Sequence, residues 1–116
     1  MPPRDPAARL RYMLDHAKEA VAMIEGKRRA DLDRDRQLNL ALVRLMEIIG
    51  EAASRIPEDA RCRYPQVPWT QIVSLRNRLI HGYDAVDFDI LWEILKSDLP
   101  PLIAALEKAV PPTRGK

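Results

Sequence analysis

Ten prolines divide this 116-residue chain into segments and limit where regular structure can form. Proline has no backbone N–H and ends or kinks a helix, so long helices must lie between prolines. Two long Pro-free stretches, residues 7–56 and 69–99, carry apolar residues at spacings of three and four. That spacing indicates helices, and an aromatic content of only 5% is unlike a β-sandwich or barrel. We predict an all-α fold, an up-and-down bundle of four to five helices.

Four principal helices follow from the apolar spacing and from the glycines and prolines beside it. The second, residues 33–56, has a wide apolar face, which predicts a central helix that contacts neighbours on several sides. Pro100 and Pro101 must kink or restart the fourth helix. The expected helices are residues 6–25 with Gly26 as terminator, 33–56, 68–81 with Gly82 as terminator, and a helix that begins after the N-cap Asp87, with one further turn within 58–63.

One domain, residues 1–110, and a flexible C-terminal tail, residues 111–116, account for the chain. Cys62 is the single cysteine, which excludes an internal disulfide and any multi-cysteine zinc or iron–sulfur site. No metal site and no cofactor is expected.

The N-terminal residues form no apolar leader, and no stretch reaches the roughly 18 to 20 apolar residues of a membrane span. We therefore expect a cytoplasmic protein without a membrane partner.

The charges are unevenly placed, although the formal net charge is only +2. Residues 60–83 contain no acid, and this segment includes Arg76, Asn77, His81 and Tyr83. A guanidinium, an amide, an imidazole and a phenol are groups that handle phosphate. The segment is also compatible with a basic amphipathic helix whose histidine and tyrosine are structural. Its spacing alone favours that second interpretation.

Helical geometry separates the two residues best suited to catalysis. At about 100° per residue, Arg76 and His81 lie about 140° apart around an ideal helix, while Asn77 and His81 stack one turn apart. Tyr83 falls two turns beyond Arg76 on one stripe. Arg76 and His81 meet at one phosphate only if the arginine reaches round, the helix unwinds near Gly82, or a second subunit contributes. A twofold dimer would build a shared cleft from both copies.

Two other patterns suggest sites but have simpler explanations. Residues 31–35 imitate the start of a calcium loop, yet Arg36 and Leu42 occupy positions that need Gly and Glu. Acids at the positive end of a helix dipole explain that segment better. Glu47 and Glu51 are four residues apart and could do acid–base work if buried. Without a partner motif, they are expected to be exposed polar residues.

At the basic segment and its neighbours the sequence strongly resembles the HEPN superfamily, and within it the HepT-like toxins that are encoded beside a minimal nucleotidyltransferase. The resemblance covers most of the chain. An Arg-x-x-x-x-His pattern alone is weak, and the ordered series of segments makes the resemblance specific. The segments are Ile48 to Ala53, Pro65 to Trp69, Arg76-Asn77 through His81-Gly82-Tyr83, and Val86-Asp87 followed by Trp92 and Leu99-Pro100.

The resemblance implies a HEPN-like helical domain that is the toxin of a type VII-like toxin–antitoxin system. Such a toxin is a metal-independent endoribonuclease that acts on RNA as a homodimer. By this resemblance Arg76 holds the scissile phosphate, His81 exchanges protons, and Asn77 orients either His81 or the phosphate. Arg78, in the same basic segment, is predicted to bind RNA. Tyr83 matches the tyrosine that the partner, an MntA-type nucleotidyltransferase antitoxin, adenylylates to silence such toxins.

A non-catalytic role stays open, in which the chain is a helical subunit that binds nucleotide or substrate within a nucleotidyltransferase complex. RNA cleavage in EDTA that is lost in His81→Ala separates the two roles. We also expect a homodimer through the third and fourth helices, because their apolar surface exceeds what a four-helix monomer readily covers. The residues behind this expectation are Trp69, Ile72, Val73, Ile80 and Trp92.

Overall fold

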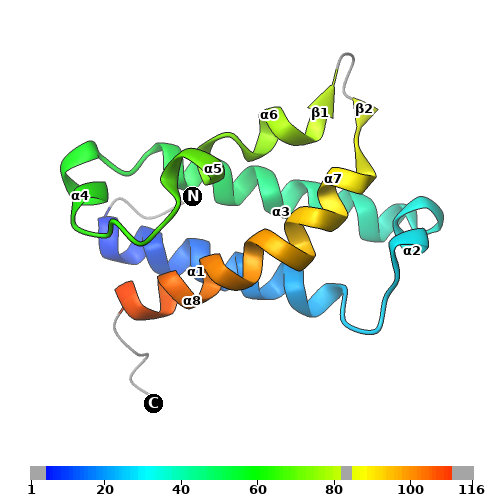
Figure 1. Ribbon diagram of the computed structural model, residues 1–116, viewed down its shortest axis with the longest axis horizontal. Helices are drawn as coiled ribbons and strands as arrows, with labels where there is room; N and C mark the ends of the chain where they lie inside the picture. The colour runs from blue at the N-terminus through cyan, green and yellow to red at the C-terminus, as the bar shows by residue number, and fades with distance from the viewer. Residues whose placement is uncertain (1–4, 82–84, 111–116) are drawn as a thin grey trace.

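Two long helices, α1 (Pro6–Met23) and α3 (Arg36–Ser54), pack side by side in the computed structural model of the protein (Figure 1). The structure describes residues 5–81 and 85–110, with the backbone alone at His81. α8 (Leu99–Ala109) packs along α1. The predicted all-α bundle is confirmed, with a short β-hairpin added to it. The other elements are α2 (Arg29–Arg34), α4 (Glu58–Cys62), α5 (Trp69–Val73), α6 (Leu75–Leu79), β1 (Ile80–His81), β2 (Ala85–Val86), α7 (Phe88–Glu93) and the π-helical turn η1 (Ile94–Asp98).

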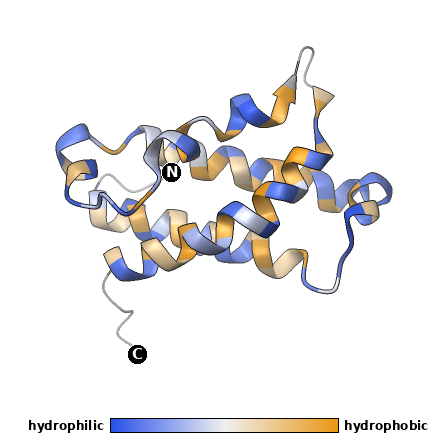
Figure 2. Cartoon of the chain, in the orientation of Figure 1, coloured by the Kyte–Doolittle hydropathy of each residue, from blue (hydrophilic) through white to orange (hydrophobic). Residues whose placement is uncertain are grey.

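α3 is the central helix that its wide apolar face predicts. It contacts α1, α2, α5 and α6, and its residues Leu42, Met46 and Ile49 are completely buried. Hydrophobic and hydrophilic residues alternate along the helices in Figure 2, as expected of amphipathic helices around one core. None of the described helices is both long and apolar enough to cross a membrane.

The first two predicted helices have different boundaries in the structure. α1 is slightly shorter than predicted, and Gly26 follows it with a φ of 76°, the left-handed conformation that favours glycine. Asp35 divides the predicted helix 33–56 into α2 and α3, because its carboxylate accepts a hydrogen bond from the N–H of Leu38 at 3.0 Å and caps α3. The prediction of one continuous helix is therefore wrong, and this acid serves to begin a helix.

The prediction of one helix over residues 68–81 is wrong as well. The helix breaks at Ser74, which separates α5 from α6. The hydroxyl of Ser74 donates to the carbonyl of Gln71 at 3.1 Å. In a continuous α-helix the N–H of Leu75 would use that carbonyl, so the serine side chain competes with the backbone at this point.

α6 ends at Leu79 because the chain enters an antiparallel hairpin instead of another helical turn. Ile80 is extended (φ −105°, ψ 121°) and pairs with Val86, and both are β-branched residues that favour strands. The N–H of Asp87 donates to the carbonyl of Leu79 at 2.8 Å and closes the base of the hairpin. The carboxylate of Asp87 caps α7, as predicted. The hairpin stands at one edge of the bundle in Figure 1, and its first strand includes His81.

Pro100 and Pro101 restart the last helix, as predicted. Neither has an N–H that could donate to the preceding turn, and the chain reaches them through the π-helical turn η1. The N–H of Leu99 donates to the carbonyl of Ile94, five residues earlier, and α8 then begins with the prolines in its first turn.

The apolar residues behind the expected dimer are mostly covered within one chain. Ile72 is buried, and Trp69, Ile80 and Trp92 are partly buried against the core. Val73 is the member of this set that is classed as exposed. The expectation of an uncovered apolar surface is therefore wrong for Ile72 and holds for Val73.

Candidate active site

A groove of about 380 Å³ lies between α3 and the α5–α6 segment. Spacings of three and four residues place its α3 members on one face of that helix. Two of the predicted site residues, Arg76 and Asn77, meet this face from α6. The lining residues are Arg44, Glu47, Gly50, Glu51, Ser54, Val73, Arg76 and Asn77.

Gly50 allows the α5–α6 segment to lie this close to α3. A Cβ atom at Gly50 would stand 3.1 Å from the carbonyl oxygen of Ile72 and 3.9 Å from Cβ of Leu75. The first distance is tighter than ordinary van der Waals contact, so a side chain at Gly50 would press on the backbone of α5. A glycine inside a helix costs roughly 0.5–1 kcal/mol relative to alanine, and the close packing offsets that cost. The glycine thus keeps Arg76, which follows Leu75, next to the central helix.

Glu47 is the least exposed charged residue in the groove, and it contacts two arginines. Its Oε2 lies 3.7 Å from Nε of Arg76, and its Oε1 lies 3.5 Å from Nη1 of Arg44. The Glu47 side chain is 27% exposed, against 60% for Arg76 and 66% for Arg44. The second carboxylate, Glu51, pairs with Arg55 at 2.9 Å. One partly buried carboxylate therefore bridges two guanidinium groups that extend toward solvent.

The structure brings Arg76 and Asn77 together in the groove, but not Arg78. Nη2 of Arg78 lies 2.9 Å from Oδ2 of Asp98, and both side chains are partly buried. This ion pair joins α6 to η1, and Arg78 does not line the groove. The RNA-binding role of Arg78 stays a prediction.

His81 lies on β1 rather than on a helix. The prediction that Asn77 and His81 stack one helical turn apart is therefore wrong, because the helix ends at Leu79. The helix on which a stripe from Arg76 to Tyr83 is predicted ends at Leu79. The helix ends two residues before His81. This early end resembles the unwinding near Gly82 that is predicted from the sequence as one way for His81 to approach Arg76. Tyr83 and the side chain of His81 lie outside the described residues.

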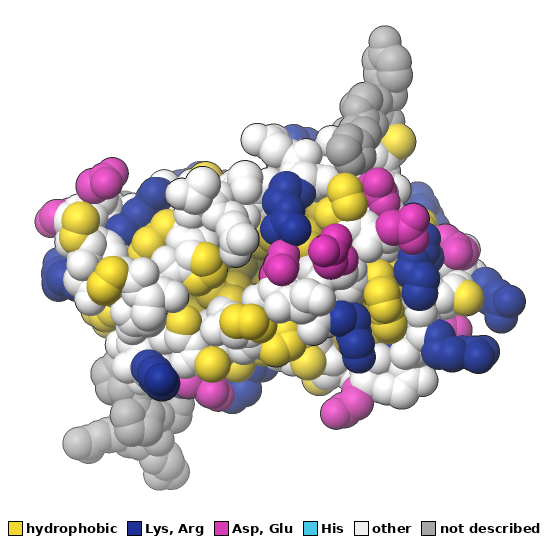
Figure 3. Space-filling model, viewed as in Figure 1, with side chains coloured by type: hydrophobic (Ala, Val, Ile, Leu, Met, Phe, Trp, Pro, Cys, Tyr) yellow, Lys and Arg dark blue, Asp and Glu magenta, His cyan; other side chains and the backbone are white. Residues whose placement is uncertain are grey.

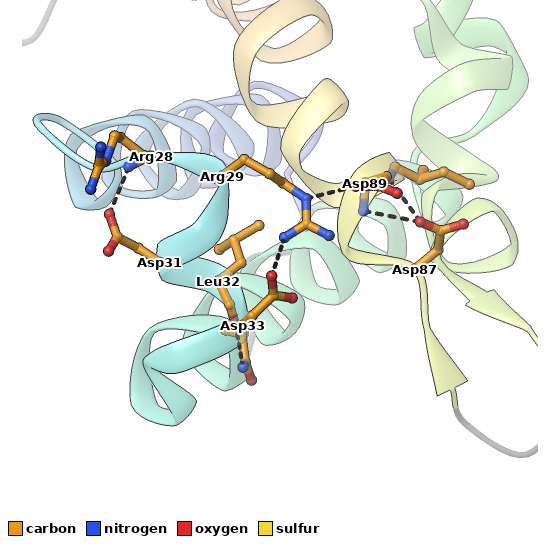
Figure 4. A network of polar contacts seen from close by, with 9 residues as sticks. Arg28, Arg29, Asp31, Leu32, Asp33, Asp87 and Asp89 are labelled. Carbon is orange, nitrogen blue, oxygen red and sulfur yellow. Dashed lines mark hydrogen bonds and ion pairs between the residues drawn. The ribbon is translucent and has the colours of Figure 1, made fainter.

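A polar network between α2 and the start of α7 anchors the chain just after the hairpin (Figure 4). Arg29 donates from Nε to Oδ1 of Asp89 at 2.7 Å and from Nη1 to Oδ2 of Asp33 at 3.1 Å. The hydrogen bond to Asp89 raises the pKa of Arg29 above its ordinary value, against a smaller lowering by burial. Asp87 accepts from the backbone N–H groups of Asp89 and Ile90. Figure 3 shows charged side chains of both signs gathered at this end of the molecule, over α2 and α7.

Two contacts around the site are not predicted by the sequence. Glu47 is expected to be exposed, but it is partly buried and ion-paired to Arg76. Its spacing along α3 identifies a helical face and does not reveal which segment packs on that face. Arg61 belongs to the acid-free segment, but it donates to the carbonyls of Ile56 at 2.9 Å and Ala53 at 3.2 Å and caps the end of α3. Among the side chains that the structure describes, no group of three or more His, Cys, Asp or Glu is placed to hold a metal ion.

Known proteins are similar in sequence to this chain over most of its length. A family model described as ribonuclease HepT-like matches residues 13–109. A Methanocaldococcus jannaschii protein named as an RNase is 32% identical over 116 residues, which cover 100% of this chain and 96% of that protein. A Thermococcus cleftensis protein named as a ribonuclease HepT is 37% identical over 99 residues, 82% of this chain and 90% of its own. A Caldanaerobacter subterraneus protein named as an RNase is 33% identical over 99 residues, 85% of this chain and 88% of its own.

No solved structure gives a significant match to this chain. The region matched by the family model includes all of α3 and α6, the helices that carry the charged residues of the groove. The family match and the names of these relatives agree with the prediction of an endoribonuclease. The chain belongs to the HepT-like ribonuclease family.

Proposed function

We propose that this chain is the toxin of a type VII-like toxin–antitoxin system, a metal-independent endoribonuclease that uses the 2′-hydroxyl of its RNA substrate as nucleophile. The groove beside α3 carries the proposal, because Arg76 and Asn77 project into it together from α6. The family match supports the ribonuclease activity. The 2′-hydroxyl supplies the nucleophile, so the protein itself has to bring neither a serine nor a metal-bound water.

The reaction needs one group that stabilises a phosphate and one that moves protons. The 2′-oxygen attacks the adjacent phosphorus while the bond from phosphorus to the 5′-oxygen breaks, which leaves a 2′,3′-cyclic phosphate and a 5′-hydroxyl. The guanidinium of Arg76 suits the charge that develops on the phosphate oxygens. We assign the proton transfers to His81, which takes the 2′-hydroxyl proton and returns one to the 5′-oxygen. Asn77, beside Arg76, orients the phosphate or the histidine.

The proposal includes a homodimer in the cytoplasm. Val73, in the lining of the groove, and Leu40, one helical turn before Arg44, are the large apolar residues that are exposed in the described chain, at 37% and 52%. A twofold partner that covers both would bring two grooves toward each other. Light scattering tests this step, and a monomer with full activity would remove the dimer from the proposal.

The proposal also includes a partner of a different kind. By the resemblance in sequence, a separately encoded MntA-type nucleotidyltransferase adenylylates Tyr83 and silences the toxin. An attached nucleotide adds negative charge, which would compete with RNA for the arginines of the groove.

RNA cleavage by the purified protein in EDTA tests the central claim. We expect cleavage by the wild type and a rate lower by about 10²- to 10⁴-fold in His81→Ala, the usual contribution of general acid–base catalysis. Arg76→Ala should be similarly impaired. Arg34→Ala removes an exposed arginine outside the groove, and this matched control should keep the wild-type rate.

Circular dichroism must first show that each variant is folded. Undiminished cleavage by folded His81→Ala would overturn the catalytic assignment. Wild-type protein that binds RNA or nucleotide but cuts no RNA would favour the non-catalytic subunit of a nucleotidyltransferase complex instead.

A further inference from the structure

The groove holds a second arginine, and it comes from a different helix. Arg44 lies on α3 and Arg76 lies on α6, and their guanidinium groups contact opposite oxygens of the Glu47 carboxylate. Two guanidinium groups that both contact one carboxylate are close enough to repel each other, and the negative charge of Glu47 between them offsets that repulsion. The shared carboxylate therefore holds two cations in one groove.

The groove and the ion pairs at its edge together carry an excess of positive charge. Glu51 is matched by Arg55, at 2.9 Å. Glu47 alone faces both Arg44 and Arg76. The described groove lining itself holds two carboxylates and two arginines. Arg55 pairs with Glu51 from outside the lining, so the described cluster as a whole has three arginines against two carboxylates, which leaves an excess of positive charge. Such an excess favours an anionic ligand.

The arginines of the groove are accessible to that ligand, and the carboxylate is less so. Glu47 is the least exposed of the three side chains, while Arg44 and Arg76 are both largely exposed. Their contacts with Glu47 are longer than those of strong charge-assisted hydrogen bonds, and exposed ion pairs of this kind are weak. Arg76 makes its contact through Nε, so its outer nitrogens can bind another acceptor. An incoming phosphate can thus engage both arginines.

We propose that Arg44 is a second phosphate-binding residue of the groove, and that Glu47 positions it relative to Arg76. Arg44 contacts the RNA phosphate next to the one that Arg76 holds. The inference rests on the proposed function, since it extends the same RNA site. A single RNA strand carries one phosphate per nucleotide, so a strand along the groove presents consecutive anions to arginines from two helices. Because this contact is to the backbone, it adds affinity without base preference.

The salt dependence of RNA binding tests the role of Arg44. We would measure binding of a single-stranded oligonucleotide in the His81→Ala background, in which cleavage is expected to be about 10²- to 10⁴-fold slower than in the wild type. We expect Arg44→Ala to weaken binding and to make the plot of log K against log salt shallower by about 0.7, the value for one lost phosphate contact on a single strand. Arg34→Ala is the matched control and should leave the slope unchanged. Equal slopes in Arg44→Ala and Arg34→Ala would overturn the inference.

Glu47→Gln tests the positioning role, because the amide keeps the size of the side chain and removes its charge. If Glu47 only repels RNA, the variant binds RNA more tightly and cuts it at least as fast as the wild type. If Glu47 positions the arginines, kcat falls while KM stays the same or decreases. Wild-type kcat in Glu47→Gln would overturn the positioning role.

The proposed function and this inference fail in different ways. A wild-type protein that neither binds nor cuts RNA would overturn both. A wild-type protein that cuts RNA, with Arg44→Ala indistinguishable from Arg34→Ala in binding, would overturn the inference alone.

Discussion

The backbone N–H of Asp87 donates to the carbonyl oxygen of Leu79 at 2.8 Å, across the base of the hairpin that carries His81. This bond joins the last residue of α6 to the N-cap of α7. Both ends of the hairpin are thus fixed on helices, and one of these helices carries Arg76. The strand pairing and this bond, rather than a helix, hold the backbone of His81 relative to the arginine.

Asp87→Ala tests how strongly the cap stabilises the chain after the hairpin. The carboxylate accepts from the N–H groups of Asp89 at 3.0 Å and Ile90 at 3.1 Å. We expect the alanine variant to lower the free energy of unfolding by about 0.5–2 kcal/mol. Asp87→Asn should stay close to the wild type, because asparagine caps a helix equally well. Urea unfolding measures both, and equal losses in the two variants would contradict the capping role.

Arg29→Ala removes the ion pairs with Asp33 and Asp89. Both carboxylates are exposed, so we expect a loss of less than about 1 kcal/mol, which shrinks in high salt. Urea unfolding at low and high salt measures this loss, with Arg34→Ala as the matched control.

The pH dependence of the Arg29 contribution follows from the direction of its pKa shift. Because the pKa of Arg29 is raised in the folded protein, its contribution is present below the ordinary arginine pKa and is lost as pH rises through the raised value. The stability difference between wild type and Arg29→Ala should therefore not fall between neutral and mildly alkaline pH. Thermal melts across that range check it, and an early fall would contradict the assignment.

Gly50→Val tests the close approach of α3 and α5. The added side chain must displace the carbonyl of Ile72, and overpacking of this kind costs roughly 1–3 kcal/mol. We expect RNA cleavage to fall as well, because Arg76 moves with α6. In Gly50→Ala the contact is smaller and the gain in helix propensity, roughly 0.5–1 kcal/mol, offsets it. Chemical unfolding compares the two, and a valine variant as stable as the wild type would show that the segments do not touch.

Tyr83→Phe tests the proposed switch. We expect this variant to keep its fold and its nuclease activity but to escape silencing when the nucleotidyltransferase and ATP are supplied, since phenylalanine has no hydroxyl to modify. Mass spectrometry should find no AMP-sized gain on the peptide that contains residue 83. Tyr64→Phe, at a partly buried tyrosine before α5, is the matched control and should still be silenced. Silencing of Tyr83→Phe as complete as in the wild type would exclude this residue as the switch.

Local chemistry in the sequence accounts for much of the fold. Asp87 begins α7 because a carboxylate can satisfy free backbone N–H groups, whatever lies nearby. Pro100 restarts the last helix because it has no N–H to donate, and Gly26 takes the positive φ that other residues avoid. The wide apolar face of α3 correctly predicts its central position. Each of these features depends on one residue type or on one helical period.

The sequence by itself thus determined the helical bundle, the capping role of Asp87 and the presence of Arg76 and Asn77 in one basic segment. The tertiary structure decided the rest of the site. α6 ends at Leu79 because strands β1 and β2 pair, and such pairing is invisible to a helical period. Glu47 meets Arg76 because Gly50 lets two segments that are distant in sequence pack closely. Helical spacing tells which residues share a face, and only packing tells what that face contacts.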